Sequence, residues 1–304
     1  MRYKLFTGDC LDILKQLPDN SVDSCITDPP YGMGMEHWDH SVPSVGIWEE
    51  VMRVLKPGAF CLSFCSPQLY HRMATAVEEA GFNIQDQIMW MITTKMPKKN
   101  RLKPAHEPIV VAQKPFKGSI QKNFEEWGVG KIDVLTTRVP WDGKPPTGWV
   151  AEGGKRRSFG KDGKHARATL IETKEEGWVE VESGKWVEFG KVDANPDGRY
   201  PSNIIGEVLT EHQKYFYAPR VTRKERGEYN DHPTPKPISL MSYLCKIYCP
   251  PDKVVLDPFC GSGSTGIGAL LEGRKFFGID MEEHYTLISE KRIQEHVYTE
   301  GEDE

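Results

Sequence analysis

Residues 254–266 constrain the fold of this chain more than any other segment. An apolar run at 253–256 predicts a short strand, a glycine-rich turn follows, and residues 264–272 have the composition of a helix. The glycines from Gly261 to Gly266 are spaced Gly-x-Gly-x-x-Gly. A strand that enters a helix through such a turn is typical of parallel α/β sheets, which bind ligands at the carboxyl ends of their strands.

Short strands alternate with helices along both ends of the chain, which predicts an α/β fold with a doubly wound, mostly parallel Rossmann-like sheet. The predicted strands are residues 3–6, 22–27, 59–64, 84–93, 107–112, 253–256 and 275–279. The predicted helices are residues 11–17, 48–55, 70–80, 238–248, 264–272 and 285–296. The carboxyl-terminal order of strand, glycine turn, helix, strand and helix is continued by the amino-terminal strands. We therefore predict a circularly permuted sheet, with both chain ends at the surface between its second helix and third strand.

The composition changes near Lys114, where the chain becomes rich in Gly, Lys, Trp and Pro up to residue 200. One hairpin stands out, because residues 178–182 and 185–189 alternate at strand period around Ser183-Gly184. We predict one domain from residues 1–115 and 206–304, with an inserted region at 116–205.

Composition excludes several classes of protein. No apolar run approaches the roughly 20 residues of a membrane span, and the amino terminus lacks the apolar core of a signal peptide. We expect a cytoplasmic protein of a bacterium or phage. The seven cysteines include pairs four residues apart, Cys61/Cys65 and Cys245/Cys249, which is not the spacing of a zinc site. Buried thiols and no metal are expected.

Charge is distributed unevenly along the chain. The net charge is −5, but residues 95–168 contain 17 Lys and Arg against 7 Asp and Glu, and residues 169–200 contain 4 against 8. A basic middle in an acidic protein indicates a surface for a polyanion. The alternative is a solvated lysine-rich face.

Asp28-Pro29-Pro30-Tyr31 directly follows the strand predicted at 22–27, where an open α/β sheet binds its ligand. The Asp28 carboxylate and the Pro29 carbonyl can accept two hydrogen bonds from an exocyclic amino group, and Tyr31 can stack on the ring that carries it. Pro30 stiffens the loop. The alternative is that Asp28 is only a turn or helix-capping acid.

Acidic residues at other strand ends narrow the ligand class. Asp257 can bind an ammonium group, and Asp280, about 20 residues further on, lies where a ribose-binding acid belongs, unless it is a surface turn residue. An acidic rim without a P-loop lysine favours S-adenosylmethionine over a nucleoside polyphosphate. Asp9 can accept the adenine amine of this cofactor, or cap the helix from Leu11.

His232-Pro233-Thr234-Pro235-Lys236-Pro237 forms a rigid approach to the helix predicted at 238–248. Thr234 can cap this helix, and Lys236 with the nearby N–H groups would attract a carboxylate. The methionine carboxylate of the cofactor is the candidate. A plain structural loop is the alternative.

These residues predict a mechanism of amino-group methylation. An amino nitrogen conjugated to a purine is a poor nucleophile, and hydrogen bonds from its N–H groups to Asp28 and Pro29 would localise its lone pair. The sulfonium methyl would then transfer in line, and the proton would be lost afterwards. Because the amine is paired in a duplex, the base must first leave the helix.

Together these motifs resemble the β class of DNA amino-methyltransferases, over residues 1–113 and 215–296. In that class the Asp-Pro-Pro-Tyr half precedes the cofactor half, and target recognition lies between them. The resemblance implies catalytic roles for Asp28, Pro29, Pro30 and Tyr31. The cofactor-binding residues that it implies, with their neighbours, are Asp9, Cys10, Thr234, Lys236, Asp257, Pro258, Phe259, Cys260, Gly261, Ser262, Gly263, Asp280 and Met281.

The resemblance implies a site-specific DNA methyltransferase that uses S-adenosylmethionine on double-stranded DNA, with residues 116–205 as its target-recognition region. Aspartate rather than serine before Pro-Pro-Tyr favours adenine N6 over cytosine N4, which stays an alternative. Contacts to DNA are expected from the basic side chains of Lys98, Lys99, Arg101, Lys155, Arg156 and Arg157. A homodimer and a cognate restriction endonuclease are compatible partners.

Two other classes of protein stay open. One is a non-catalytic DNA-binding protein that retains the fold, although intact Asp28, Tyr31 and Asp257 argue against it. The other is a nicotinamide dehydrogenase on a similar sheet, which would not need Asp-Pro-Pro-Tyr.

Overall fold

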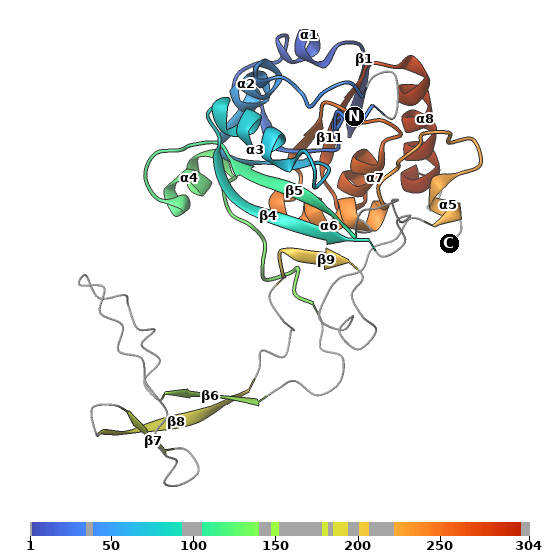
Figure 1. The fold of residues 1–304 in the computed structure, drawn as a ribbon. Helices are drawn as coiled ribbons and strands as arrows, with labels where there is room; N and C mark the ends of the chain where they lie inside the picture. The colour runs from blue at the N-terminus through green and yellow to red at the C-terminus, as the bar shows by residue number, and fades with distance from the viewer. Residues whose placement is uncertain are drawn as a thin grey trace. The chain divides into compact units, whose positions relative to one another are not determined.

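The computed structural model of the chain describes most of its regular elements (Figure 1). The described residues are 2–34, 39–92, 105–139, 147–151, 178–181, 185–193, 201–206 and 222–298. They belong to two compact units, one formed by residues 1–137 and 201–304 and the other by residues 138–200.

An eight-stranded sheet forms the centre of the first unit, in the order β1-β11-β10-β2-β3-β5-β4-β9. The strands are β1 (Tyr3–Thr7), β2 (Val22–Thr27), β3 (Leu55–Phe64), β4 (Asn83–Met91), β5 (His106–Gln113), β9 (Ile204–Gly206), β10 (Val254–Asp257) and β11 (Lys275–Asp280). The strands from β1 to β3 in this order are all parallel, and β5 is antiparallel to β3 and β4. The predicted α/β class with a mostly parallel sheet is confirmed.

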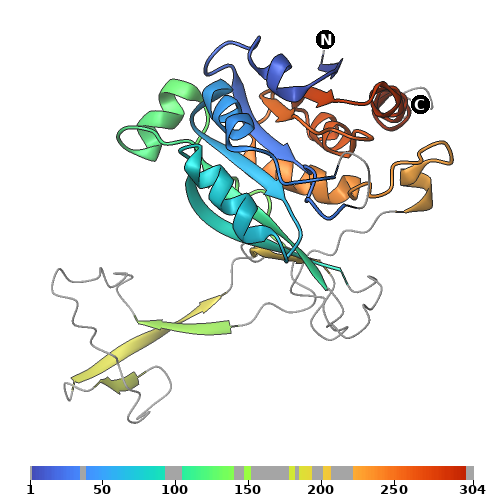
Figure 2. The same ribbon diagram turned by 45° about the horizontal axis from the view of Figure 1, so that its top comes forward.

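Helices cover both faces of this sheet (Figures 1 and 2). They are α1 (Cys10–Leu14), α2 (Val45–Val54), α3 (Tyr70–Glu79), α4 (Ile120–Trp127), α5 (Arg223–Arg226), α6 (Ile238–Tyr248), α7 (Ser264–Leu271) and α8 (Glu283–Ile293), which continues as a π-helix over Gln294–Tyr298. Alternate residues of each strand point to opposite faces, so Ile26 packs with residues of α6 and α7, and Cys25 packs with residues of α1, α2 and α3. The sheet is therefore doubly wound.

The two ends of the chain meet in this sheet, as the sequence predicts. The carboxyl-terminal strands β10 and β11 lie between β1 and β2, with Leu5 opposite Gly278 and Val255 opposite Ser24. The strands β2, β10 and β11 therefore end at one edge of the sheet, where Asp28, Asp257 and Asp280 come together.

The bounds of the second unit differ from the insert predicted at 116–205. Helix α4 was not predicted, although Ser119 caps its first turn and Gly128 ends it at φ 71°. Asn123 of α4 donates hydrogen bonds to the carbonyl groups of Pro57 and Val129, and β9 pairs with β4. These contacts place residues up to 137, and those from 201, in the first unit.

The second unit contains a three-stranded antiparallel sheet in the order β6-β8-β7. Its strands are β6 (Thr147–Ala151), β7 (Trp178–Val181) and β8 (Lys185–Asp193). The pairing of Val179 with Val187 confirms the predicted hairpin, and β6 adds a strand that was not predicted. A role of this unit in target recognition stays a prediction.

All seven cysteines are buried and without disulfides, which confirms the expected buried thiols. In the described part of the chain, no helix is both long and apolar enough to cross a membrane. No group of three potential metal ligands occurs among the same residues.

Candidate active site

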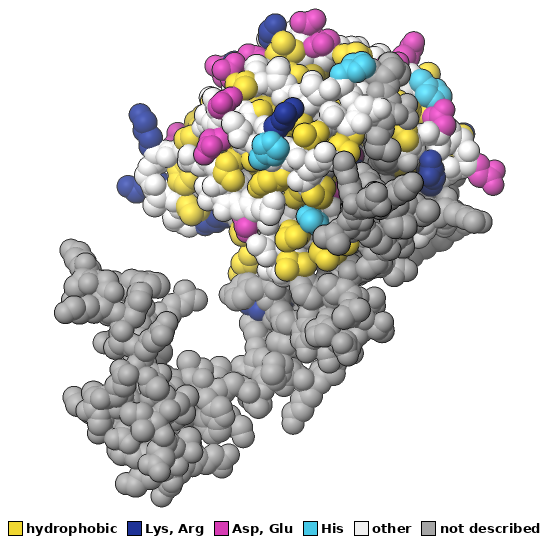
Figure 3. Space-filling model, viewed as in Figure 1, with side chains coloured by type: hydrophobic (Ala, Val, Ile, Leu, Met, Phe, Trp, Pro, Cys, Tyr) yellow, Lys and Arg dark blue, Asp and Glu magenta, His cyan; other side chains and the backbone are white. Residues whose placement is uncertain are grey.

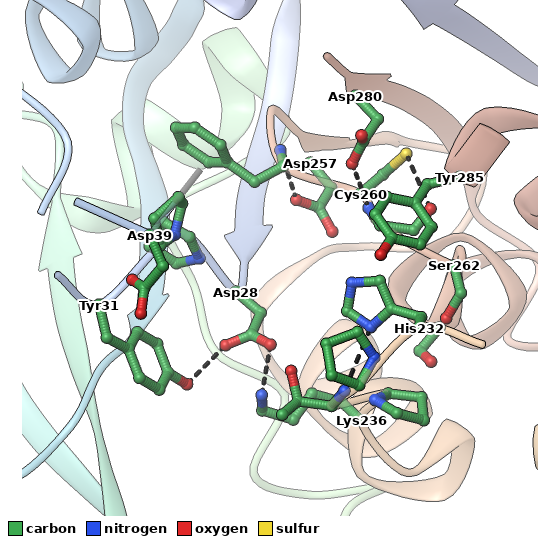
Figure 4. Close-up of a pocket in the computed structure, with 18 of the residues that line it drawn as sticks. Asp28, Tyr31, Asp39, His232, Lys236, Asp257, Cys260, Ser262, Asp280 and Tyr285 are labelled. Carbon is green, nitrogen blue, oxygen red and sulfur yellow. Dashed lines mark hydrogen bonds and ion pairs between the residues drawn. The ribbon is translucent and has the colours of Figure 1, made fainter. Parts of the chain in front are cut away.

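A cavity of about 700 Å³ opens at the carboxyl edge of the sheet. Its walls come from the loops after β2, β10 and β11 and from the loop before α6 (Figure 4). The loops of three adjacent parallel strands meet there, so residues far apart in sequence share one cavity. Asp28 and Asp257 both line it, and Thr27, the last residue of β2, donates a hydrogen bond to Asp257, 230 positions further along the chain.

The Asp28 carboxylate has a hydrogen-bond donor on each oxygen. Its Oδ1 accepts a hydrogen bond of 2.5 Å from the Tyr31 hydroxyl, and its Oδ2 is paired with the Lys236 ammonium (Figure 4). The Lys236 Nζ also lies 3.8 Å from Oε2 of Glu107, the second residue of β5. The side chains of Lys236, Glu107 and Asp28 are 6%, 12% and 19% exposed, so this group of charges is largely shielded from solvent.

Burial and charge act against each other in this group. Burial raises the pKa of Asp28, the charge of Lys236 opposes that rise, and the charge of Glu107 adds to it. Burial lowers the pKa of Lys236, but the carboxylates of Asp28 and Glu107 outweigh burial and leave it above the ordinary value. Burial and the Asp28 charge hold the pKa of Tyr31 well above 10, so its hydroxyl stays a donor.

The glycine-rich turn is fixed from both sides. On one side, Oδ2 of Asp280 accepts a hydrogen bond of 2.8 Å from the amide of Gly261, and Oδ1 accepts one of 2.9 Å from Glu282. On the other, the fully buried Arg292 of α8 donates to the carbonyl and hydroxyl of Ser262, at 2.5 and 3.0 Å. The turn is therefore held in a defined shape around the cavity.

Asp257 lies at the bottom of the cavity and is 1% exposed. Its Oδ1 accepts hydrogen bonds from the Thr27 hydroxyl at 2.6 Å and the Phe259 amide at 3.1 Å. Burial raises the pKa of Asp257 to about 7, although these hydrogen bonds oppose the rise. A buried carboxylate of this kind gains most from a cationic ligand group.

The loop before α6 differs in part from its prediction. Thr234 lines the cavity but does not cap α6, because the first amide of the helix, that of Ile238, donates to Glu225 instead. Lys236 points to Asp28. His232 accepts a hydrogen bond of 3.4 Å from the Thr234 amide at Nδ1, and burial lowers its pKa to about 4, so the ring is neutral at pH 7.

The structure shows Asp9 as the N-terminal cap of helix α1, which is one of its two predicted roles. The exposed Asp9 side chain accepts hydrogen bonds from the amides of Leu11 and Asp12, and the residues on either side of it, Gly8 and Cys10, line the cavity. Whether Asp9 also contacts a cofactor stays a prediction.

The structure brings most of the predicted site residues together. Those that line the cavity are Cys10, Asp28, Pro29, Pro30, Tyr31, Thr234, Lys236, Asp257, Pro258, Phe259, Cys260, Gly261, Ser262, Asp280 and Met281. Gly263 instead packs against Ser289 of α8. The roles assigned to these residues stay predictions.

The residues predicted to contact DNA lie outside the described parts. They are Lys98, Lys99, Arg101, Lys155, Arg156 and Arg157. On the face in Figure 3, acidic and basic side chains of the described residues are interspersed. The predicted basic contacts to DNA stay a prediction.

Three lining residues carry no signal in the sequence by which we could have assigned them to the site. Asp39 accepts hydrogen bonds from the amides of Gly32 and Met33, at 2.6 and 3.0 Å, and so closes the loop after Tyr31. Glu107 lines the cavity from β5. Tyr285 of α8 also lines it, and its ring centroid lies 4.8 Å from that of His232.

A parallel sheet with a glycine-rich turn and an acid-lined cavity at its carboxyl edge defines a nucleotide-binding α/β protein. Within that class, the chain matches the DNA methylase family of N6/N4 methyltransferases over residues 22–291, and it belongs to this family. It is 23% identical to the type II methyltransferase M.ScaI of Streptomyces caespitosus in an alignment of 298 positions, which covers 95% of this chain and 81% of that protein.

Solved structures share the fold. The M1.HpyAVI–SAM complex is similar with a TM-score of 0.52 and 20% identity, over 96% of this chain and 98% of that one. The cytosine-N4-specific PvuII DNA methyltransferase is similar with a TM-score of 0.59 and 17% identity, over 96% of this chain and 86% of that one. Both matches show a likeness of fold over most of each chain.

Proposed function

We propose that this protein is a β-class, site-specific DNA methyltransferase that methylates the N6 amino group of an adenine flipped out of double-stranded DNA. The observation that supports the proposal best is the meeting of Asp28 and Tyr31 with Asp257 and Asp280 in one cavity. The first pair suits an amino group, and the second pair suits the two ends of a nucleoside cofactor.

S-adenosylmethionine is the cofactor, and it supplies an electrophilic methyl group on a sulfonium. The residues present fit this molecule. Asp257, buried and with a raised pKa, suits its ammonium group, and Asp280 retains free lone pairs on both carboxylate oxygens for the ribose hydroxyls. Gly261 packs closely on the loop before α6, since a Cβ there would lie 2.8 Å from Nε2 of His232.

Asp28 and Pro29 prepare the amino group of the base for attack. The Asp28 carboxylate and the Pro29 carbonyl accept its two N–H groups, which localises the nitrogen lone pair and turns it toward the methyl donor. Tyr31 donates to Oδ1 of Asp28, so it orients the carboxylate while its ring is available to the base. The new N–C bond would form as the methyl–sulfur bond breaks and leaves a neutral thioether, and the nitrogen, cationic after transfer, would then give one proton to solvent.

Cytosine N4 is the second candidate for the methylated group. The PvuII enzyme, whose fold is similar, is cytosine-N4-specific, and the same pair of acceptors would suit either amino group. We favour adenine because aspartate, rather than serine, precedes Pro-Pro-Tyr.

One assay tests the proposal. The purified protein is incubated with unmethylated genomic DNA and S-adenosylmethionine, and the nucleosides released by digestion are identified by mass spectrometry. N6-methyladenine is expected, and Asp28→Asn should form it at least about a hundredfold more slowly. N4-methylcytosine would retain the mechanism and change the base. Neither product, with the cofactor still bound, would leave the non-catalytic DNA-binding alternative.

A further inference from the structure

Lys236 contacts the Asp28 carboxylate, although its sequence position suggested the carboxylate of the cofactor. We infer that Lys236 is a positioning residue that keeps Asp28 ionised and oriented for the amino group of the target base. This inference rests on the proposed function and adds to it a residue that acts through Asp28 without touching the base.

The geometry holds the ammonium of Lys236 at Asp28. Its Nζ lies between the Asp28 and Glu107 carboxylates, and 5.3 and 5.6 Å from the ring centroids of Phe64 and Tyr31. These groups enclose the amine, whose side chain is 6% exposed. Pro235 and Pro237 flank Lys236 and fix the backbone from which it extends.

An ammonium is needed because the other charges around Asp28 are negative. The titratable groups that face Asp28 are Tyr31 from its own loop, Glu107 from β5, Cys65 after β3, Asp257 from β10 and Lys236. Burial and Glu107 favour the protonated form of Asp28, in which one oxygen would become a donor. Lys236 is the cation among these groups, and it favours the ionised form.

The contact with Lys236 leaves Asp28 able to accept hydrogen bonds from the target base. Each carboxylate oxygen has two acceptor positions, and Tyr31 and Lys236 occupy one on each oxygen. The remaining positions are available to an N–H of the base. Lys236 therefore sets the charge and the plane of the carboxylate without competing for its last acceptor sites.

Two substitutions of opposite effect test the inference. Lys236→Met removes the cation and Glu107→Gln removes the nearby anion, while both keep side-chain volume. The rate constant of a single turnover with bound cofactor is measured against pH, and cofactor affinity is measured by calorimetry. In Lys236→Met the acid limb of the rate profile should shift to higher pH by about one unit or more. In Glu107→Gln it should shift to lower pH. Lys236→Arg should restore part of the wild-type profile.

Other outcomes would overturn the inference. An acid limb that coincides with that of the wild type, together with a large loss of cofactor affinity in Lys236→Met, would make Lys236 a cofactor ligand. A wild type that forms no methylated base would overturn the proposed function instead. In that case the titration of Asp28 is followed by carbon-13 NMR of labelled aspartate, assigned with Asp28→Asn. An unchanged Asp28 pKa in folded Lys236→Met protein would still refute the role of Lys236.

Discussion

At the scale of single residues, the cavity holds two carboxylates in largely buried positions. Asp28 and Asp257 lie at the ends of adjacent strands, and burial raises the pKa of both. They differ in their surroundings, since Asp28 has an ammonium on one oxygen and Asp257 has a hydroxyl and an amide. We expect the two acids to respond differently to substitution and to pH.

Loss of Asp28 should stop chemistry and spare cofactor binding. Asp28→Asn keeps the shape of the side chain but weakens it as an acceptor, so turnover should fall by about 10²–10⁴-fold. Asp28→Ala should do the same, and should also destabilise the fold because it removes the carboxylate nearest to the buried Lys236 ammonium. Single-turnover kinetics and calorimetric titration with S-adenosylmethionine separate the two effects. Failure of both variants to bind the cofactor would mean that Asp28 belongs to the cofactor site.

Cofactor affinity should depend on the ionisation of Asp257. Its pKa is about 7, so the carboxylate that would bind the cofactor ammonium is half protonated near neutral pH. Affinity should rise with pH by up to about tenfold per unit below this pKa and level off above it. Calorimetry from about pH 6 to about pH 8 checks this, with Asp257→Asn as the variant that should lack the dependence.

The raised pKa of Asp257 also predicts how the stability of the cofactor-free protein depends on pH. The folded state binds a proton at Asp257 more tightly than the unfolded chain, whose carboxyl has the ordinary pKa of 3.8. The contribution of Asp257 to stability should therefore fall as pH rises from about 4 to about 7. Urea unfolding of the wild type and Asp257→Asn should diverge across this window, and parallel curves would contradict the raised pKa.

At the scale of elements, the close packing of α8 on the glycine-rich turn fixes the cofactor site. Gly263 has φ 82°, and a Cβ there would lie 2.2 Å from the Ser289 hydroxyl and 3.2 Å from its Cα. Ser289 and Arg292 lie on the buried side of α8, so the helix both excludes a side chain at Gly263 and holds Ser262 by hydrogen bonds.

Gly263→Ala should therefore cost more stability than an alanine at a comparable glycine. Gly273 also has positive φ, 77°, but open space around its Cβ position, so Gly273→Ala reports the backbone cost alone, about 1 kcal/mol. Gly263→Ala adds overpacking and should reduce stability by about 2–4 kcal/mol. Urea unfolding of both variants measures the difference, and equal reductions would mean that α8 moves away freely.

Elements with strong patterns were predictable, and the others were not. Strand β10 is a short apolar run that ends in Asp257, and β2 ends one residue before Asp28, so sequence alone located the edge of the sheet that carries the cavity. Helix α4 was missed although Ile120, Phe124 and Trp127 recur at helical spacing, because it is only eight residues long and lies in a segment rich in Gly, Lys, Trp and Pro. Glu107 was missed because its partners, Tyr31 and Lys236, lie 76 and 129 positions away, and no spacing pattern connects them.

At the scale of the whole molecule, binding to DNA should depend on the basic middle of the chain. Reversing the charges of Lys155, Arg156 and Arg157 should weaken binding to DNA and flatten its dependence on salt. The slope of log affinity against log salt should fall by about 1 for each phosphate that the protein no longer neutralises. Fluorescence anisotropy with a labelled duplex at several salt concentrations measures this slope.

A matched control carries the same change in net charge elsewhere. Lys4, Lys15 and Lys275 are exposed in the first unit, and their reversal to glutamate should leave the salt slope nearly unchanged. A slope that stays constant in the first variant, or changes equally in both, would mean that residues 155–157 form only a solvated loop.

The position of β10 and β11 inside the sheet also determines when the protein can first become active. Asp257 meets Thr27 only after 230 further residues have been synthesised, which takes roughly ten to fifty seconds at ordinary translation speeds. Until then β2 lacks β10, one of its two neighbours, and the nascent chain holds Asp28 without the glycine-rich turn and Asp257. Such non-local pairing also slows folding. The complete cavity can therefore form only late in synthesis, after β10 and β11 have been made.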